Sequence, residues 1–186
     1  MTIEEINSTI EFWSQWASNE QEPRYDIALF KISVCFEKFI SELFVSYSIG
    51  EPSEKGYLPE RLLEFQDQKQ LEVFIRPPSK AYIDYPSQIK NLSKYIFKKN
   101  PFDVILTNCN YSSSYQDIIA IRNYVAHESG EARQKLIDRL FNKRSEKFVE
   151  PSVFLKNKKK QLGVTHFTYY VNCIHEMSNL LVEEVS

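Results

Sequence analysis

The chain has 186 residues, of which 42% are hydrophobic, 26% charged and 14% aromatic, and its formal net charge is −2. This length suits one domain with a real core. Its apolar runs are far shorter than the roughly 20 residues that cross a bilayer, and its acidic start does not resemble a secretory signal. The aromatic content excludes a disordered chain, and four glycines are few for an all-β fold, which needs many tight turns. We therefore expect a helical protein that is neither membrane-spanning nor secreted.

Three cysteines, Cys35, Cys109 and Cys173, form no disulfide framework, because their number is odd and their spacing irregular. We interpret them as reduced thiols of a cytoplasmic protein, each a small buried side chain. His166 and Cys173 can share a helix face, but two ligands do not make a zinc site. No glycine-rich phosphate loop is present either. The sequence thus predicts no metal site and no cofactor.

The near-neutral total charge hides an uneven distribution. Residues 1–65 hold 12 acidic and 5 basic side chains, whereas residues 139–160 hold 8 basic and 2 acidic ones. A basic segment of this kind attracts polyanions, although it also serves simply as a solvated surface. The candidate RNA-binding residues of the basic segment are Lys143, Arg144, Lys156, Lys158, Lys159 and Lys160.

The N-terminal third predicts two helices. Thr2 and Glu5 have the spacing of a capping box, and isoleucines and a tryptophan then follow at helical spacing, which indicates a helix over about 2–19. From 24 to 48 there is no glycine or proline, and apolar side chains cover most of the circumference. Such a helix is central and buried, and Gly50 can end it as a C-terminal cap.

Residues 50–110 are predicted to form an insert interrupted by prolines, with short helices expected at 59–66, 68–75 and 87–98. The apolar piece FDVILT is assigned as a further helix.

Three more helices are expected in the second half, over about 112–129, 131–142 and 164–184. Ser112–Ser114 can cap the first of them, and Gly130 can stop it. Together the elements predict one all-α helical-bundle domain spanning residues 1–186.

The run Arg122-Asn123-Tyr124-Val125-Ala126-His127 is the sharpest local feature. Arg122 and His127 lie about 140° apart on a helical wheel, so one straight helix does not aim them at one point. They meet if the helix loosens just before Gly130, or if a second copy of the helix packs against this one. The face opposite the apolar stripe holds Gln116, Ala120, Asn123 and His127.

This run resembles the signature of the HEPN superfamily, in which an Arg is followed by a polar residue, often Asn, and by a His five positions after the Arg. Arg122, Asn123 and His127 fill those places. The segment CFEKFISELF resembles the long second helix of such domains, where Glu37 takes the place of an acidic residue near the site. The resemblance covers about two helices. It implies a HEPN-like bundle with additional short helices and loops.

The resemblance also implies a metal-independent endoribonuclease or a non-cutting relative that binds RNA or protein. Family members usually form homodimers with the two motif helices facing each other. Many are toxins of toxin–antitoxin or anti-phage defence systems, neutralised by an antitoxin such as a small nucleotidyltransferase-like protein. A helical scaffold in which the motif is coincidental is the third reading of the sequence.

The residue types suit RNA cleavage without a metal. An unperturbed His titrates near 6.5, so His127 is assigned as general acid/base. Arg122 offers planar donors to phosphate oxygens and is assigned to stabilise the transition state, with Asn123 as a positioning residue. Glu37 lies on an apolar face, wants a cationic partner and is assigned a supporting role. Tyr124 stacks a base or simply packs. For each residue an ordinary structural role is the alternative: a helix-end His, a salt-bridging Arg and solvated or paired polar groups.

Overall fold

The computed structural model describes residues 1–19, 23–76, 83–142, 147–159 and 162–184, and this part of the chain is all-α. Two isolated β-bridges are the extended pairing found within it. Its helices are α1 (Ile3–Asn19), α2 (Tyr25–Ile49), α3 (Gln68–Ile75), α4 (Tyr85–Ile96), α5 (Asp103–Leu106), α6 (Ser112–His127), α7 (Gly130–Leu136), the π-helix η1 (Ile137–Phe141), α8 (Pro151–Lys156) and α9 (His166–Leu181).

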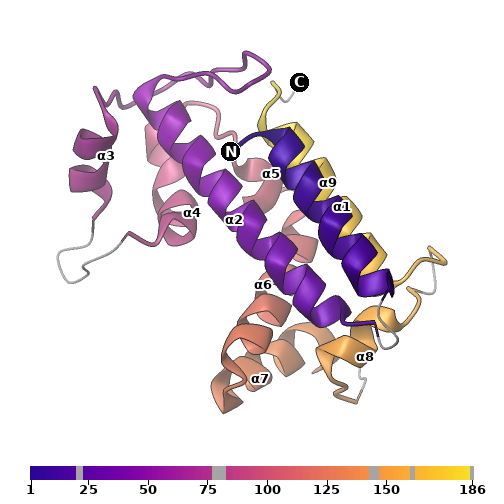
Figure 1. The fold of residues 1–186 in the computed structure, drawn as a ribbon. Coiled ribbons are helices and arrows are strands. Elements are labelled where there is room, and N and C mark those ends of the chain that lie inside the picture. Colours follow the sequence, from indigo (N-terminus) through magenta and orange to yellow (C-terminus); the bar gives the residue numbers. More distant parts are fainter. Residues whose placement is uncertain (20–22, 77–82, 143–146, 160–161, 185–186) are drawn as a thin grey trace.

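Helix α2 is the centre of the fold, as its apolar circumference predicts. It packs against α1, α3, α4, α6, α8 and α9. Figure 1 shows α1 and α9 side by side along one flank of α2, with α3 and α4 on the other flank and α6 crossing below. This arrangement holds one long face of α6 against the core and leaves the opposite face outside it.

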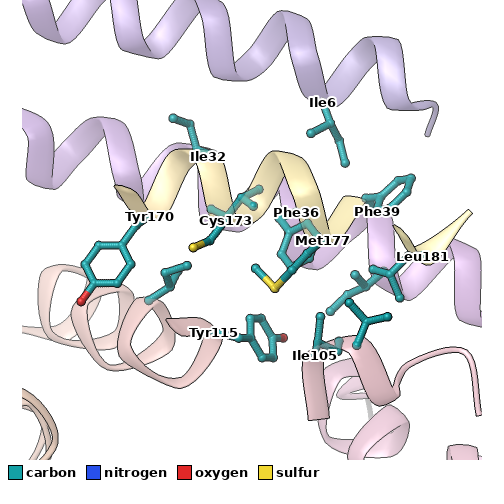
Figure 2. Packing of buried hydrophobic residues seen from close by; sticks show 14 of the residues in the cluster. Ile6, Ile32, Phe36, Phe39, Ile105, Tyr115, Tyr170, Cys173, Met177 and Leu181 are labelled. Carbon is teal, nitrogen blue, oxygen red and sulfur yellow. The ribbon is translucent and has the colours of Figure 1, made fainter. Parts of the chain in front are cut away.

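The core between α2, α6 and α9 is built from large side chains. Phe36 of α2, Tyr115 of α6 and Met177 of α9 converge there (Figure 2). Phe36 and Tyr115 meet edge-to-face, with ring centroids 5.9 Å apart. Aromatic pairs of this geometry add about 1 kcal/mol beyond the area they bury. The core therefore fixes the position of α6 relative to α2.

The start of α1 and the end of α2 lie where the local sequence predicts them. In the capping box the Thr2 N–H donates to Glu5 Oε2 at 2.7 Å, and the Glu5 N–H donates to Thr2 Oγ1 at 3.2 Å. Gly50 ends α2 with a φ of 90°, which a residue bearing a Cβ adopts only with strain. A Cβ at this glycine would lie 2.7 Å from Nη2 of Arg61. Both predictions are confirmed, and Gly50 also makes room for a guanidinium.

The helix predicted over 59–66 is wrong. Arg61 forms an antiparallel bridge with Phe97, the Leu62 N–H donates to the Ile96 carbonyl, and the Lys98 N–H donates to the Glu60 carbonyl. Backbone groups of this segment therefore hydrogen-bond to the last residue of α4 and to the residues just after it, and not within a helix of their own. The helices expected at 68–75 and 87–98 correspond to α3 and α4, and the FDVILT piece contains α5.

The boundaries around α6 differ from the predicted ones. Ser112–Ser114 make no side-chain cap, because Tyr111 takes the cap position and the Ser114 hydroxyl bonds to the Tyr169 hydroxyl instead. Helix α6 ends at His127, and Glu128 adopts a left-handed φ of 45°. Gly130, the expected stop, is the first residue of α7. The helix predicted over 131–142 divides into α7 and η1, and the last one corresponds to α9.

The three cysteines form no disulfide and differ in their burial. Cys173 is buried as expected, Cys35 is half-buried, and Cys109 is exposed, so the expectation of burial is wrong for Cys109. Cys109 lies in the turn before α6. The assignment of residues 1–186 to one domain stays a prediction.

Candidate functional site

Helix α6 carries the motif and has two faces. Its buried side chains, Ser114, Tyr115, Ile118 and Ile121, point into the core. The opposite face carries Gln116, Ile119, Asn123 and His127, which line two adjoining pockets. The helical period thus separates packing residues from candidate functional residues along one element.

Arg122 is held by α2 and by its own neighbour in sequence. Its Nη2 lies 2.8 Å from Oε2 of Glu37 on α2, and its Nη1 donates to Oδ1 of Asn123 at 2.8 Å. The pair is partly buried, with 27% of the Arg122 side chain and 19% of the Glu37 side chain exposed. The Nε of Arg122 is buried and has no hydrogen-bond partner among the described residues. The guanidinium is therefore fixed in direction and retains unused donors.

Burial raises the pKa of Glu37 above its usual value, and Asp84 across the pocket adds to the rise, while Arg122 opposes it. Burial likewise raises the pKa of the Tyr115 hydroxyl beneath the pair, so this phenol stays neutral. Glu37 is thus a carboxylate that depends on Arg122 for its charged form. The sequence predicted that Glu37 needs a cationic partner, and the structure supplies an arginine.

The first pocket, named the α4–α6 pocket, lies between α2, α4, α5 and α6 and has a volume of about 370 Å³. Glu37 and Arg122 lie on one wall. Asp84, the residue that caps α4, and Lys90 lie on the other. Two acidic and two basic side chains therefore line it.

The second pocket, named the α6–α7 pocket, lies between α6, α7 and η1 and has a volume of about 450 Å³. His127 lines it at the end of α6, together with Lys135 of α7 and Arg139 of η1. The two pockets share Gln116, Ile119 and Asn123. Arg122 and His127 of one chain therefore line neighbouring hollows separated by a common wall.

His127 is the last residue of α6, and its side chain is exposed. The imidazole makes no hydrogen bond to any described residue. The helix does not loosen before Gly130; it ends at His127, and the next residue, the left-handed Glu128, donates its N–H to the Tyr124 carbonyl. His127 is therefore free to reach a ligand, and it is placed by a chain reversal rather than by a widened helical turn.

Tyr124 points to a different part of the molecule. Its hydroxyl donates to Oε2 of Glu150 at 2.9 Å, and its ring packs edge-to-face on Phe148. These contacts favour packing over base stacking among the two roles considered for this residue.

The basic segment is only partly described. Lys143, Arg144 and Lys160 lie outside the described residues. Lys156 and Lys158 are exposed, and the ammonium of Lys159 lies 3.2 Å from the ring centroid of Tyr169. Lys156, Lys158 and Lys159 line neither pocket. The structure thus brings Glu37, Arg122 and Asn123 together, and it places His127 in the adjoining pocket, which shares only Asn123 with that group.

The sequence did not single out Asp84, Lys135 or Arg139. Asp84 was detectable as a helix cap, since it precedes Tyr85-Pro86, but only the fold directs it at Glu37. Arg139 bonds Oδ1 of Asp117 at 2.5 Å and the backbone carbonyl of Ser113 at 2.6 Å. This ion pair joins α6 to η1, and its Arg139 lines the α6–α7 pocket.

Comparison with protein-family models, curated proteins and solved structures finds no match. No helix in the described chain is long and apolar enough to cross a bilayer. The described residues also contain no cluster of three His, Cys, Asp or Glu side chains placed to hold a metal ion.

Proposed function

We propose that this protein is a HEPN-type, metal-independent endoribonuclease. One observation carries the proposal: Arg122, Asn123 and His127 line two adjoining hollows on the outer face of one helix, with Asn123 in the shared wall. A phosphodiester lying across that wall would meet a guanidinium on one side and an imidazole on the other. Those are the two groups that RNA cleavage without a metal requires.

In the proposed reaction the ribose 2′-oxygen attacks the adjacent phosphorus and the bond from phosphorus to the 5′-oxygen breaks. The 2′-hydroxyl loses its proton, the departing 5′-oxygen gains one, and a 2′,3′-cyclic phosphate remains. His127 moves a proton at one of these oxygens. The second N–H of Nη1 and of Nη2 of Arg122, which are not bonded to Asn123 or Glu37, donate to the phosphate oxygens as negative charge builds on them.

Glu37 and Asn123 serve as positioning residues in this scheme. They hydrogen-bond two different nitrogens of the guanidinium, so Arg122 loses little conformational entropy when a phosphate binds. The partial burial of the ion pair strengthens these contacts relative to water.

The same resemblance supports the rest of the proposal. We propose a cytoplasmic toxin or defence component that acts on RNA as a homodimer and is held in check by an antitoxin such as a small nucleotidyltransferase. The basic segment around Lys156 and Lys158 is proposed to bind the RNA backbone away from the cleaved bond.

The test is incubation of the purified protein with mixed single-stranded RNA in the presence of EDTA. The expected products end in 2′,3′-cyclic phosphate, and His127→Ala abolishes them while the circular dichroism spectrum stays native. His175→Ala is the matched control, because His175 is an exposed histidine on α9 that lines neither pocket. Equal cleavage by wild type and His127→Ala would overturn the proposal.

A second function, a HEPN-type module that binds RNA or a protein without cutting, is favoured by one observation. Arg122 is already bonded to Glu37 and Asn123, as a purely structural arginine would be. Tight RNA binding without fragments would support this alternative. If the protein neither binds nor cleaves RNA, the remaining interpretation is a helical scaffold.

A further inference from the structure

The α6–α7 pocket has an apolar floor with short side chains. Ile119 and Ala120 of α6 and Ala132 of α7 line it. The two alanines leave the space that larger side chains would fill, and the volume of about 450 Å³ lies within the roughly 300–1,000 Å³ range of small-ligand sites. Such a floor suits a planar apolar surface.

A side-chain amide also lines this pocket. Gln116 is half-buried in the wall between the two pockets, and its side chain makes no hydrogen bond within the described part of the chain. Beside it, the Oδ1 of Asn123 accepts from Arg122, which leaves the NH₂ of that amide to donate. Side-chain amides both donate and accept, as the edges of nucleobases do.

The charges around the pocket favour an anion. Lys135 and Arg139 outnumber Glu131 among the ionised side chains that line it. Arg139 is held by Asp117 and Ser113, but Lys135 is bonded only to Glu131, and both of those side chains are more than 70% exposed. An exposed pair of this kind is weak, so Lys135 can exchange its carboxylate for a phosphate.

We propose that the α6–α7 pocket binds one nucleotide of single-stranded RNA next to the cleaved bond. Its base lies on the floor formed by Ile119, Ala120 and Ala132. Gln116 hydrogen-bonds the edge of that base, and Lys135 contacts a phosphate. A single strand is required because base pairing in a duplex occupies the edge that Gln116 would reach. The inference rests on the proposed function in taking RNA as the substrate, and it adds a site that selects which base lies beside the scissile phosphate.

The test measures binding of the four nucleoside 5′-monophosphates to the whole protein by titration calorimetry, with amide NMR to locate the contact. Ribose 5-phosphate, which lacks a base, is the reference probe. At least one mononucleotide is expected to bind about tenfold more tightly than ribose 5-phosphate, because the base buries apolar surface against the floor and the sugar phosphate does not. The perturbed amides are expected in α6 and α7.

Two leucine substitutions on α6 form a matched pair. Ala120→Leu fills the floor and is expected to remove the preference for mononucleotides, whereas Ala126→Leu adds the same side chain at an exposed position outside the pocket and leaves it intact. Gln116→Leu is expected to change the order of preference among the four bases. Gln116→Leu therefore tests the pocket even if Ala120→Leu does not fold.

Mononucleotides that bind no better than ribose 5-phosphate would overturn the inference, as would equal effects of the two leucine substitutions. The inference and the proposed function fail separately. Base-dependent binding without RNA cleavage defeats only the nuclease, whereas RNA cleavage without any base-dependent binding defeats only the pocket.

Discussion

Arg122 and Glu37 are 85 residues apart in the chain, yet an ion pair of 2.8 Å joins them across the contact between α6 and α2. The pair lines the α4–α6 pocket, as does Asp84, whose charge acts on Glu37. Its strength decides both the charge of Glu37 and the direction of the guanidinium.

The pH dependence of stability is predicted to reflect Glu37. Burial raises its pKa in the folded state, so its contribution to the free energy of unfolding is fully present below the unfolded pKa near 4.5 and is lost as the pH rises through the folded pKa. Glu37→Gln lacks this titration. The difference in unfolding free energy, wild type minus variant, should therefore fall as the pH rises above about 4.5.

Urea denaturation at several pH values measures that difference. A difference that grows with pH would mean that Arg122 outweighs burial and lowers the pKa of Glu37 instead.

The ion pair between Asp117 and Arg139 is predicted to stabilise the junction of α6 and η1. The Asp117 side chain is 13% exposed and also accepts a hydrogen bond from Tyr170. Asp117→Ala leaves two donors without their carboxylate and should lower the free energy of unfolding by about 2–4 kcal/mol. Urea denaturation checks this, with Glu131→Ala as the control.

Glu131 pairs with Lys135 at 2.6 Å, but at the surface, so its removal should leave the urea midpoint unchanged. Equal midpoints for Asp117→Ala and the wild type would contradict the prediction.

Gly50→Ala is predicted to destabilise the protein for two reasons. The left-handed conformation costs a residue with a Cβ about 1–2 kcal/mol. The new methyl also displaces Arg61, whose Nη1 donates to the Ser48 carbonyl at 3.1 Å, and losing that bond costs about 1 kcal/mol more.

Gly56→Ala is the matched control, since Gly56 has a φ of 81° but nothing within 4 Å of the added carbon. Thermal unfolding should show the larger loss for Gly50→Ala. The excess should vanish when Arg61→Ala is present in both proteins.

The salt dependence of RNA affinity is predicted to depend on the basic segment. Each lysine that contacts a single-stranded backbone contributes about 0.7 to the slope of log affinity against log salt. Replacing Lys156 and Lys158 with glutamine should flatten the slope by about twice that amount. Replacing the exposed Lys69 and Lys94 should leave it unchanged. Equal slopes for both double variants would assign Lys156 and Lys158 to ordinary surface.

Local signals predicted most helices correctly. The capping box, the unbroken run through α2 and the glycine at its end act within a few residues, so the sequence alone reveals them. The segment from Glu60 to Leu62 was mistaken for helix because its hydrogen-bond partners lie more than thirty positions later in the chain. No local pattern records such a pairing.

The candidate site was predictable in its residues but not in its arrangement. The spacing of Arg122 and His127 was visible in the sequence, as was the need of Glu37 for a partner. The end of α6 was placed two residues late, because a non-glycine residue, Glu128, takes the left-handed conformation while a glycine stands nearby. Asp84, Lys135 and Arg139 enter the pockets through tertiary packing, which a helical wheel does not represent.

The wall shared by the two pockets links their occupancies. Gln116, Ile119 and Asn123 cannot move for a ligand on one side without changing the shape offered on the other. Any cooperativity between the two sites is reciprocal by thermodynamic necessity, so an occupant of either pocket changes affinity at its neighbour by the same factor. An inhibitor bound in the hollow beside His127 would thereby also change the affinity for a ligand beside Arg122, without contacting that arginine.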